Sequence, residues 1–145
     1  MFLLISTSFL SLCLDQLTKF LVIQTPLLEK TRGHFLQIVY TQNTGIAFSL
    51  PLEGTILIII SILLLSLGLY LAVHYLNLRL KSTQILIGLV LGGSLGNLID
   101  RFIKGSVTDF ITLGNFPVFN LADIMITLGI FLLLLNYKKL SKQKD

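Results

Sequence analysis

The chain has 145 residues, of which 54% are hydrophobic and only 12% are charged, and its mean hydropathy is +0.87. A soluble domain carries about 25% charged residues, so this composition excludes an ordinary soluble protein and indicates a membrane protein with several spans. The formal charge of +4 does not indicate a nucleic-acid partner, because most lysines and arginines gather in one short link and at the C-terminus.

Four apolar runs follow one another along the chain and predict four transmembrane helices. At about 20 residues per span the length leaves room for little else, so we expect a single integral-membrane domain over residues 1–145. The first run carries Asp15 and Lys19 and lacks a basic start and a small-x-small cleavage site, so we interpret it as a span rather than as a cleaved leader. In the third run, the spacing of Gly92 and Gly96 allows close approach of a neighbouring helix. The predicted spans are residues 2–23, 54–76, 83–102 and 118–137.

Basic residues predict the orientation of these spans. Arg79 and Lys81 lie in the link between the second and third runs, and four lysines follow the fourth run. An even number of spans places both termini and this link on one side, and enrichment in Lys and Arg predicts that this side is the cytoplasm. The four C-terminal lysines are Lys138, Lys139, Lys142 and Lys144.

The two connections on the opposite side, residues 24–53 and 104–117, then face outward. The first has apolar–polar alternation over residues 35–40, which indicates short strands. We therefore expect an all-α membrane protein, a bundle of four transmembrane helices with a small extracytoplasmic β element.

Polar side chains gather near the outer ends of the predicted spans. A carboxylate in hydrocarbon costs roughly 2.5–3.5 kcal/mol on insertion scales, so acids in spans are seldom accidental. Only seven residues of the chain are Asp or Glu. Spacings of i, i+3 and i+4 place the members of each polar group on one helix face. The groups are Asp15, Thr18 and Lys19; Asn97, Asp100 and Arg101; and Asn120 and Asp123, with Asp109 in the connection before the last span.

Asp109 and Asp123 have no basic partner at helical spacing. Two neighbouring carboxylates cannot both ionise cheaply, so such a pair holds one proton, and one member can act as a base while the other acts as an acid. Aspartic proteases activate water in this way. These residues leave open both catalysis and a proton or cation pathway, although the apolar cytoplasmic halves of the spans disfavour a path across the membrane. A structural adaptor packing through the glycines would leave the carboxylates unexplained.

The remaining polar groups allow structural interpretations. Asp15 and Lys19 are expected to form an i, i+4 ion pair that either only lowers the cost of insertion or supports the site. Asp100 and Arg101 are expected to pair at the interface and to support the end of their helix. His34 and His74 stand alone, so we expect no metal site and no cofactor, and the single cysteine excludes a disulfide within the chain.

Five short segments stand in a fixed order along the chain. Each is a weak signal alone, but together, on a scaffold of four spans, they resemble the conserved blocks of lipoprotein signal peptidase. This family is also called signal peptidase II or prolipoprotein signal peptidase, and it is aspartic peptidase family A8. The segments are Asp15–Lys19 (DQLTK), Asn43–Ser49 (NTGIAFS), Gly92–Arg101 (GGSLGNLIDR), Val107–Phe110 (VTDF) and Phe119–Asp123 (FNLAD).

The resemblance implies an intramembrane aspartyl endopeptidase of the bacterial cytoplasmic (inner) membrane. It would remove signal peptides from prolipoproteins by cutting before a diacylglyceryl-modified cysteine. The catalytic dyad of the family corresponds to Asp109 and Asp123. The residues expected to bind substrate or line the site are Asn43, Gly45, Asn97, Asp100, Arg101 and Asn120, with Asp15 and Lys19 as structural polar residues.

The resemblance also implies partners. These are diacylglyceryl-prolipoprotein substrates, membrane lipid and inhibitors of the globomycin type, with no nucleic acid, and we expect a monomer with its active site near the outer leaflet. Two positions depart from the commonest family pattern: Ile46 stands where Ala is usual, and Thr108 stands where a second Val is usual. Neither removes a catalytic group, although Ile46 could narrow a pocket wall.

Overall fold

The computed structural model of the chain describes residues 1–25, 35–45 and 54–142. It is mostly helical with one small sheet, as predicted, and the bounds of the first three long helices lie within two residues of the predicted spans. The last helix is shorter than the predicted span 118–137: it begins after the capping residue Asn120 and ends at Leu135. The elements are α1 (Phe2–Gln24), β1 (Leu36–Asn43), α2 (Thr55–Tyr75), α3 (Lys81–Lys104), β2 (Val107–Leu113), α4 (Leu121–Leu135) and α5 (Tyr137–Leu140).

Among the described residues, α2 and α3 are the helices that are long and apolar enough to cross a membrane by themselves. The 23 residues of α1 include the charged Asp15 and Lys19, while α4 is strongly apolar but has 15 residues. The count of four spans therefore stays a prediction.

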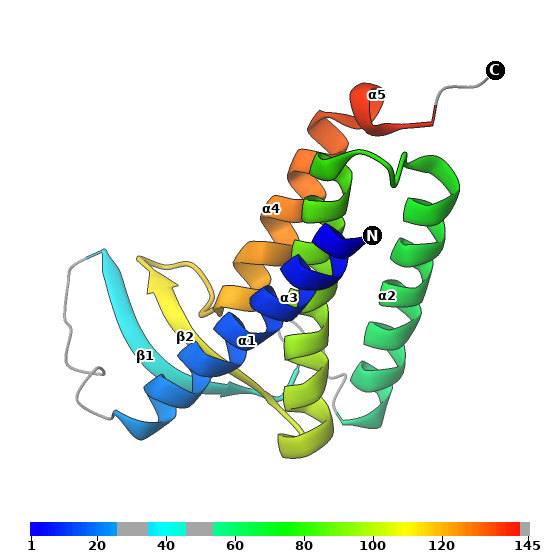
Figure 1. Cartoon of the computed structure of the whole chain (residues 1–145). Coiled ribbons are helices and arrows are strands. Elements are labelled where there is room, and N and C mark those ends of the chain that lie inside the picture. The colour runs from blue at the N-terminus through cyan, green and yellow to red at the C-terminus, as the bar shows by residue number, and fades with distance from the viewer. Residues whose placement is uncertain (26–34, 46–53, 143–145) are drawn as a thin grey trace.

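Helix α3 is the centre of the bundle and contacts α1, α2 and α4. Figure 1 shows α2 standing beside this group, and it shows the two strands next to the end of the bundle where α3 finishes and α4 begins. At the opposite end, the C-terminal segment after α4 returns to the end of α2, where Ser141 forms a β-bridge with Leu76. The site described below lies at the sheet end.

Glycines let α3 lie directly against its neighbours. A Cβ added at Gly88 would lie 2.7 Å from the Cβ of Thr7, and one at Gly92 would lie 2.6 Å from the Cβ of Ser11, both on α1. On another face of α3, a Cβ at Gly93 would lie 2.8 Å from the carbonyl oxygen of Ala122 on α4. The close approach predicted from the glycine spacing is therefore confirmed.

This packing predicts that Gly92→Ala lowers the free energy of unfolding by about 1–3 kcal/mol, the usual cost of overpacking a tight contact. Gly68→Ala on α2 is the matched control, because a Cβ there meets nothing within 4 Å. Thermal unfolding of the two purified variants in detergent should show a loss for Gly92→Ala alone. Equal melting temperatures would contradict the packing of α3 on α1.

Burial is inverted relative to a soluble protein. Large apolar side chains face outward: Phe2 is 82% exposed, Leu134 is 70% exposed and Leu64 is 65% exposed. The largest fully buried side chains are all polar: Lys19, Asn120, Thr83, Thr108, Asp15 and Asp100. An apolar exterior around a hydrogen-bonded polar interior is the arrangement that a bilayer requires.

The sheet consists of β1 and β2, which pair antiparallel with Thr41 opposite Asp109 and Asn43 opposite Val107. The strand expected near residues 35–40 is confirmed as β1, whereas β2 was not predicted. Gly105, in the left-handed conformation with φ +71°, ends α3 and lets the chain turn into β2. This short turn places Asp109 close to the end of α3.

Candidate active site

Asp109 lies in β2 and is almost completely buried, with 3% of its surface exposed. Its Oδ2 accepts a hydrogen bond from Asn43 Nδ2 at 2.9 Å, and its Oδ1 accepts one from Asn120 Nδ2 at 2.7 Å. Asn43 reaches Asp109 because it lies two residues beyond Thr41, the direct partner of Asp109, and residues i and i+2 of a strand face the same side. The sheet thus holds one carboxyl group in a fixed, buried position.

Asp123 lies in the first turn of α4 as part of a capping box. Asn120 is the N-cap residue: its Oδ1 accepts a hydrogen bond from the backbone N–H of Asp123 at 3.0 Å. In return, the backbone N–H of Asn120 donates to Oδ2 of Asp123 at 3.1 Å. The helix start therefore fixes the Asp123 carboxylate at the positive end of the α4 dipole.

Asn120 connects the two aspartates. Its amide nitrogen donates to Asp109 while its backbone nitrogen donates to Asp123, so both carboxyl groups contact this one fully buried residue. The β-bridge between Phe119 and Ile111 ties the residue before Asn120 to β2 and so sets this geometry. The two aspartates are held together by a strand and a helix cap that are adjacent in sequence.

The surroundings of Asp109 suit a shared proton. Burial raises the pKa of the Asp109 carboxyl, and the nearby charge of Asp123 raises it further, against the lowering effect of the hydrogen bonds from Asn43 and Asn120. The expectation that two close carboxylates raise one pKa agrees with this arrangement.

Asn97, from α3, supports the other aspartate. Its Nδ2 donates to Oδ1 of Asp123 at 2.8 Å, and its Oδ1 accepts hydrogen bonds from Asn120 Nδ2 at 3.0 Å and from Lys19 Nζ at 2.9 Å. If the side-chain amide of Asn97 were rotated by half a turn, its NH₂ group would face the N–H donors of Lys19 and Asn120. These two donors therefore fix Nδ2 as the atom of Asn97 that faces Asp123.

Lys19 is 1% exposed and is surrounded by three acceptors. It forms the predicted i, i+4 ion pair with Asp15 at 2.7 Å, a second ion pair with Asp100 at 3.3 Å, and the hydrogen bond to Asn97. An ammonium group has three N–H donors, so this set matches its capacity. Asp15 also accepts a hydrogen bond from the backbone N–H of Ala122 at 3.0 Å, which ties α1 to the start of α4.

Asp100 and Arg101 interact electrostatically, but the direct ion pair expected between them is replaced by ion pairs of Asp100 with two lysines. Asp100 is fully buried and pairs with Lys19 and with Lys104, the latter at 2.9 Å, and it also accepts a hydrogen bond from the backbone N–H of Thr108 at 3.1 Å. The physical reason is helix geometry, because residue i+4 lies on the same face as residue i, whereas residue i+1 points about 100° away. Asp100 therefore anchors the start of β2 to α3.

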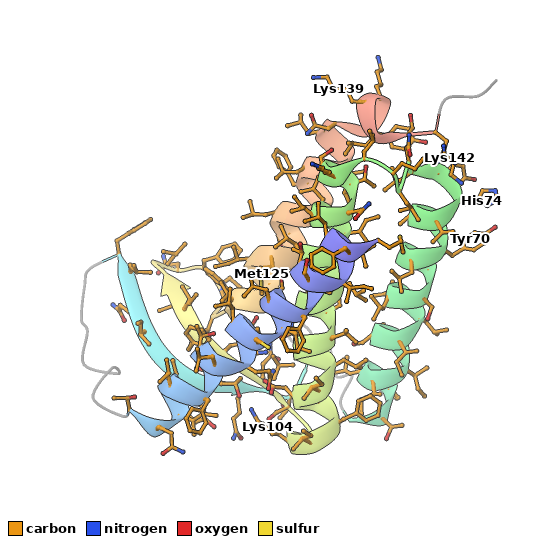
Figure 2. All side chains as sticks on the ribbon, in the orientation of Figure 1. Tyr70, His74, Lys104, Met125, Lys139 and Lys142 are labelled. Carbon is orange, nitrogen blue, oxygen red and sulfur yellow. The ribbon has the colours of Figure 1, made fainter. Side chains whose placement is uncertain are left out.

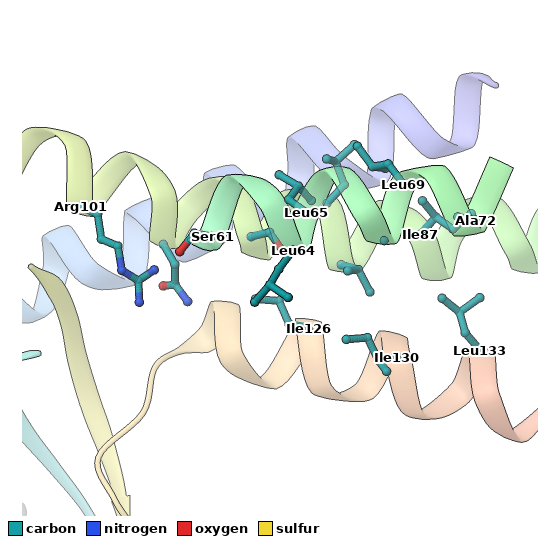
Figure 3. Close-up of a pocket in the computed structure, with 15 residues that line it drawn as sticks. Ser61, Leu64, Leu65, Leu69, Ala72, Ile87, Arg101, Ile126, Ile130 and Leu133 are labelled. Carbon is teal, nitrogen blue, oxygen red and sulfur yellow. The ribbon is translucent and has the colours of Figure 1, made fainter. Parts of the chain in front are cut away.

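Arg101 points into a cavity of about 450 Å³ between α2, α3 and α4. Figure 3 shows Arg101 at one end of this cavity and Leu133 towards the other. Asn97 also lines it, while the remaining walls are almost entirely aliphatic. The guanidinium interacts electrostatically with Asp123 and Asp109, which places the aspartate pair beside the polar end of an apolar cavity.

The structure brings together Asn43, Asn97, Asp109, Asn120 and Asp123 through direct hydrogen bonds. Gly45 contributes its backbone N–H, which donates to Oδ1 of Asn43 at 3.1 Å and orients that amide. Ile46 lies outside the described residues. Within the described parts of the chain, no cluster of three potential metal ligands occurs.

Two further contacts of the site, a helix cap and an ion pair, can also be recognised in the sequence. The spacing of Asn120 and Asp123 immediately before an apolar run is that of a capping box, which predicts their mutual hydrogen bonds. The i, i+4 spacing of Asp100 and Lys104 predicts their ion pair. The backbone contacts to Asp15 and Asp100 carry no such signal, because they depend on how the helices pack.

Comparison with known proteins places this chain in a family. The family described as "Signal peptidase (SPase) II" matches residues 7–139. A lipoprotein signal peptidase from Dehalococcoides mccartyi is 42% identical over 132 residues, which cover 85% of this chain and 81% of that protein. A lipoprotein signal peptidase from Nostoc punctiforme is also 42% identical, over 145 residues that cover 91% of this chain and 87% of that protein.

Solved structures agree with the sequence relatives. One, described as a bacterial membrane enzyme, has a TM-score of 0.76 and 31% sequence identity, and the match covers 92% of this chain and 91% of that one. A second, with the same description, has a TM-score of 0.74 and 30% identity over 98% of this chain and 93% of that one. With a family match over most of its length and relatives that share its fold, the chain belongs to the signal peptidase II family.

Proposed function

We propose that Asp109 and Asp123 are the catalytic pair with which this chain, an aspartic-type signal peptidase, removes signal peptides from prolipoproteins. The observation that carries the assignment is the shared hydrogen-bonded position of the two carboxyl groups on Asn120, beside an apolar cavity. The protonated member would polarise the scissile carbonyl while the ionised member takes a proton from the attacking water. The raised pKa of Asp109 supports its role as the proton donor.

The remaining polar residues would position the substrate and the pair. Asn97 and Asn120 hold the aspartates, and Asn43 would offer further amide groups to an extended peptide, whose own backbone groups need partners inside a bilayer. Asp15 and Lys19 act through Asn97 and Ala122 as structural residues. Neither a metal ion nor a cofactor has a role in this proposal.

The substrate is proposed to be a diacylglyceryl-prolipoprotein whose signal segment lies in the membrane. The apolar residues of that segment nearest the cut would lie in the aliphatic cavity, which runs along α3 from Arg101. The acyl chains on the cysteine after the cut would lie in surrounding lipid and set the depth of the scissile bond. Inhibitors of the globomycin type would occupy the same site.

A test of this function uses a synthetic prolipoprotein peptide in two forms, with and without diacylglyceryl on the cysteine. Each buried CH₂ adds about 0.8 kcal/mol of anchoring, and misplacement by about 1 Å can cost a hundredfold in rate, so only the lipidated form should be cut efficiently. The measurement is the initial rate of cleavage by purified protein, with and without globomycin. Rapid, globomycin-resistant cleavage of the unmodified peptide would refute the proposed substrate.

The proposed setting is the bacterial cytoplasmic membrane, with four spans in a single domain and the sheet on the outer side. Figure 2 shows Lys139 and Lys142 at one end of the bundle and Lys104, near the site, at the other. Arg79 and Lys81 lie at the same end as Lys139 and Lys142, because the β-bridge between Leu76 and Ser141 joins the two segments. With four spans, and with both termini and the basic residues on the cytoplasmic side, the site would lie near the outer leaflet. We propose that the chain works as a monomer.

The orientation predicts opposite labelling at the two ends. In a Cys13→Ser background, Asn115→Cys in the exposed turn before α4 should react with a membrane-impermeant thiol reagent in intact cells, whereas Lys139→Cys should react only after the cells are broken. Reagent bound to Lys139→Cys in intact cells would reverse the topology and place the aspartates near the wrong leaflet.

A further inference from the structure

The Arg101 side chain has a hydrogen-bonding capacity that the described residues do not use. Its Nε is buried without a partner among them, although the group lines the cavity. The two other cations near this end of α3 are engaged: Lys19 by Asp15, Asp100 and Asn97, and Lys104 by Asp100 and the Thr108 hydroxyl. A guanidinium with an unused buried donor at the end of an apolar cavity is suited to an anionic ligand.

The shape of the cavity limits what that ligand can be. On α3 its lining runs from Ile87 to Arg101, about 21 Å at 1.5 Å per residue. Apart from Arg101, the polar side chains that line it are Ser61, Ser94 and Asn97, and Asn97 is already bonded to Asp123. An occupant should therefore be long and apolar, with a single charged group at the end that meets Arg101.

The proposed reaction generates such a molecule at this place. Water oxygen adds to the scissile carbonyl carbon and the C–N bond breaks. Both protons of the water pass through the aspartate pair to the new amino group of the cysteine, which becomes an ammonium group. The signal peptide then ends in a new carboxylate next to Asp109 and Asp123. The intact substrate has a neutral peptide bond at this point, so the charge appears only after cleavage.

We propose that Arg101 binds the new C-terminal carboxylate of the cleaved signal peptide while the apolar segment of that peptide lies in the cavity. The proposal rests on the proposed function and adds a product-binding role to the same site. Arginine can donate two parallel hydrogen bonds to a carboxylate, and charge-assisted hydrogen bonds are about twice as strong as neutral ones. The positive charge also offsets repulsion between the product and the ionised member of the aspartate pair. The enzyme then holds the carboxylate form of its product, and slow release of the signal peptide limits the rate of turnover.

The test compares two peptides of the same apolar signal sequence, one ending in a carboxylate and one in a carboxamide. Binding of each fluorescent peptide to purified protein in detergent at neutral pH gives a ratio of dissociation constants, amide over acid. The wild type should bind the acid about tenfold more tightly, as expected for one hydrogen bond to a charged group. Arg101→Gln should bring the ratio near one, and Arg101→Lys should keep part of the preference because it keeps the charge.

Lys104→Gln is the matched control, because it removes a cation three residues along α3 that does not line the cavity. Its ratio should equal that of the wild type. Equal binding of the two peptides by the wild type, or an unchanged ratio in Arg101→Gln, would overturn the proposal. Cleavage of the lipidated precursor is measured on the same wild-type sample, so cleavage with a ratio of one refutes only the role of Arg101, whereas absence of cleavage refutes the proposed function itself.

Discussion

Asp109→Asn and Asp123→Asn should each reduce cleavage of a lipidated prolipoprotein peptide by roughly a thousandfold or more. Residues that act as one catalytic unit lose most of the rate when either member is removed. Asparagine keeps the size of each side chain but can neither share a carboxyl proton nor take one from water. The rate measured in single-turnover assays is the quantity to compare, because it separates chemistry from product release.

Both variants should remain folded, for a reason visible in the contacts. An asparagine at 123 can accept only one of the two hydrogen bonds that Asp123 accepts, from Asn97 or from the Asn120 backbone, but α4 keeps the cap provided by the Asn120 side chain. Circular dichroism and thermal unfolding in detergent provide the control. If either folded variant kept more than a few per cent of the wild-type rate, the assignment of the catalytic pair would fail.

The positions of the helices could be predicted from the sequence because each depends on a local property. Runs of apolar residues gave the bounds of α1, α2 and α3 within two residues, and the spacing of Gly92 and Gly96 gave the close contact of α3 with α1. The ion pair of Asp15 with Lys19 followed from i, i+4 spacing on one helix. Each of these features is determined within a single element or by one repeated residue type.

The polar network could be predicted only in part, because its contacts join the five elements α1, β1, α3, β2 and α4. The carboxylate of Asp15 contacts a backbone N–H at the start of α4, 107 residues away. Lys19 on α1 bonds Asn97 on α3, and no pattern within either helix selects that partner. The strand β2 does not follow from the sequence because VTDFITL lacks a strict apolar–polar alternation, yet it positions Asp109. Resemblance to the family named these residues, and the structure supplies the contacts that bring them together.

Lys19→Met should be the most damaging substitution outside the proposed catalytic pair. Methionine has similar length but leaves the carboxylates of Asp15 and Asp100 buried without this cation, and breaking a buried ion pair from one side costs about 3–5 kcal/mol. It also releases the amide of Asn97 from one of the two donors that fix its orientation toward Asp123. We therefore expect both a lower free energy of unfolding and a cleavage rate at least about tenfold lower in the molecules that remain folded.

Lys104→Met is the matched comparison, because Lys104 pairs with the same Asp100 at 2.9 Å but is 33% exposed and does not contact Asn97. Partial exposure weakens an ion pair, so its loss should cost about 1 kcal/mol or less and should leave most of the cleavage rate. Thermal unfolding separates the two stabilities, and single-turnover rates at saturating peptide separate the effects on chemistry. If Lys19 acted only as a buried structural cation, Lys19→Met would lose stability while its folded fraction kept the wild-type rate. A selective fall in that rate would instead place Lys19 in the chain of contacts that runs from α1 through Asn97 to Asp123.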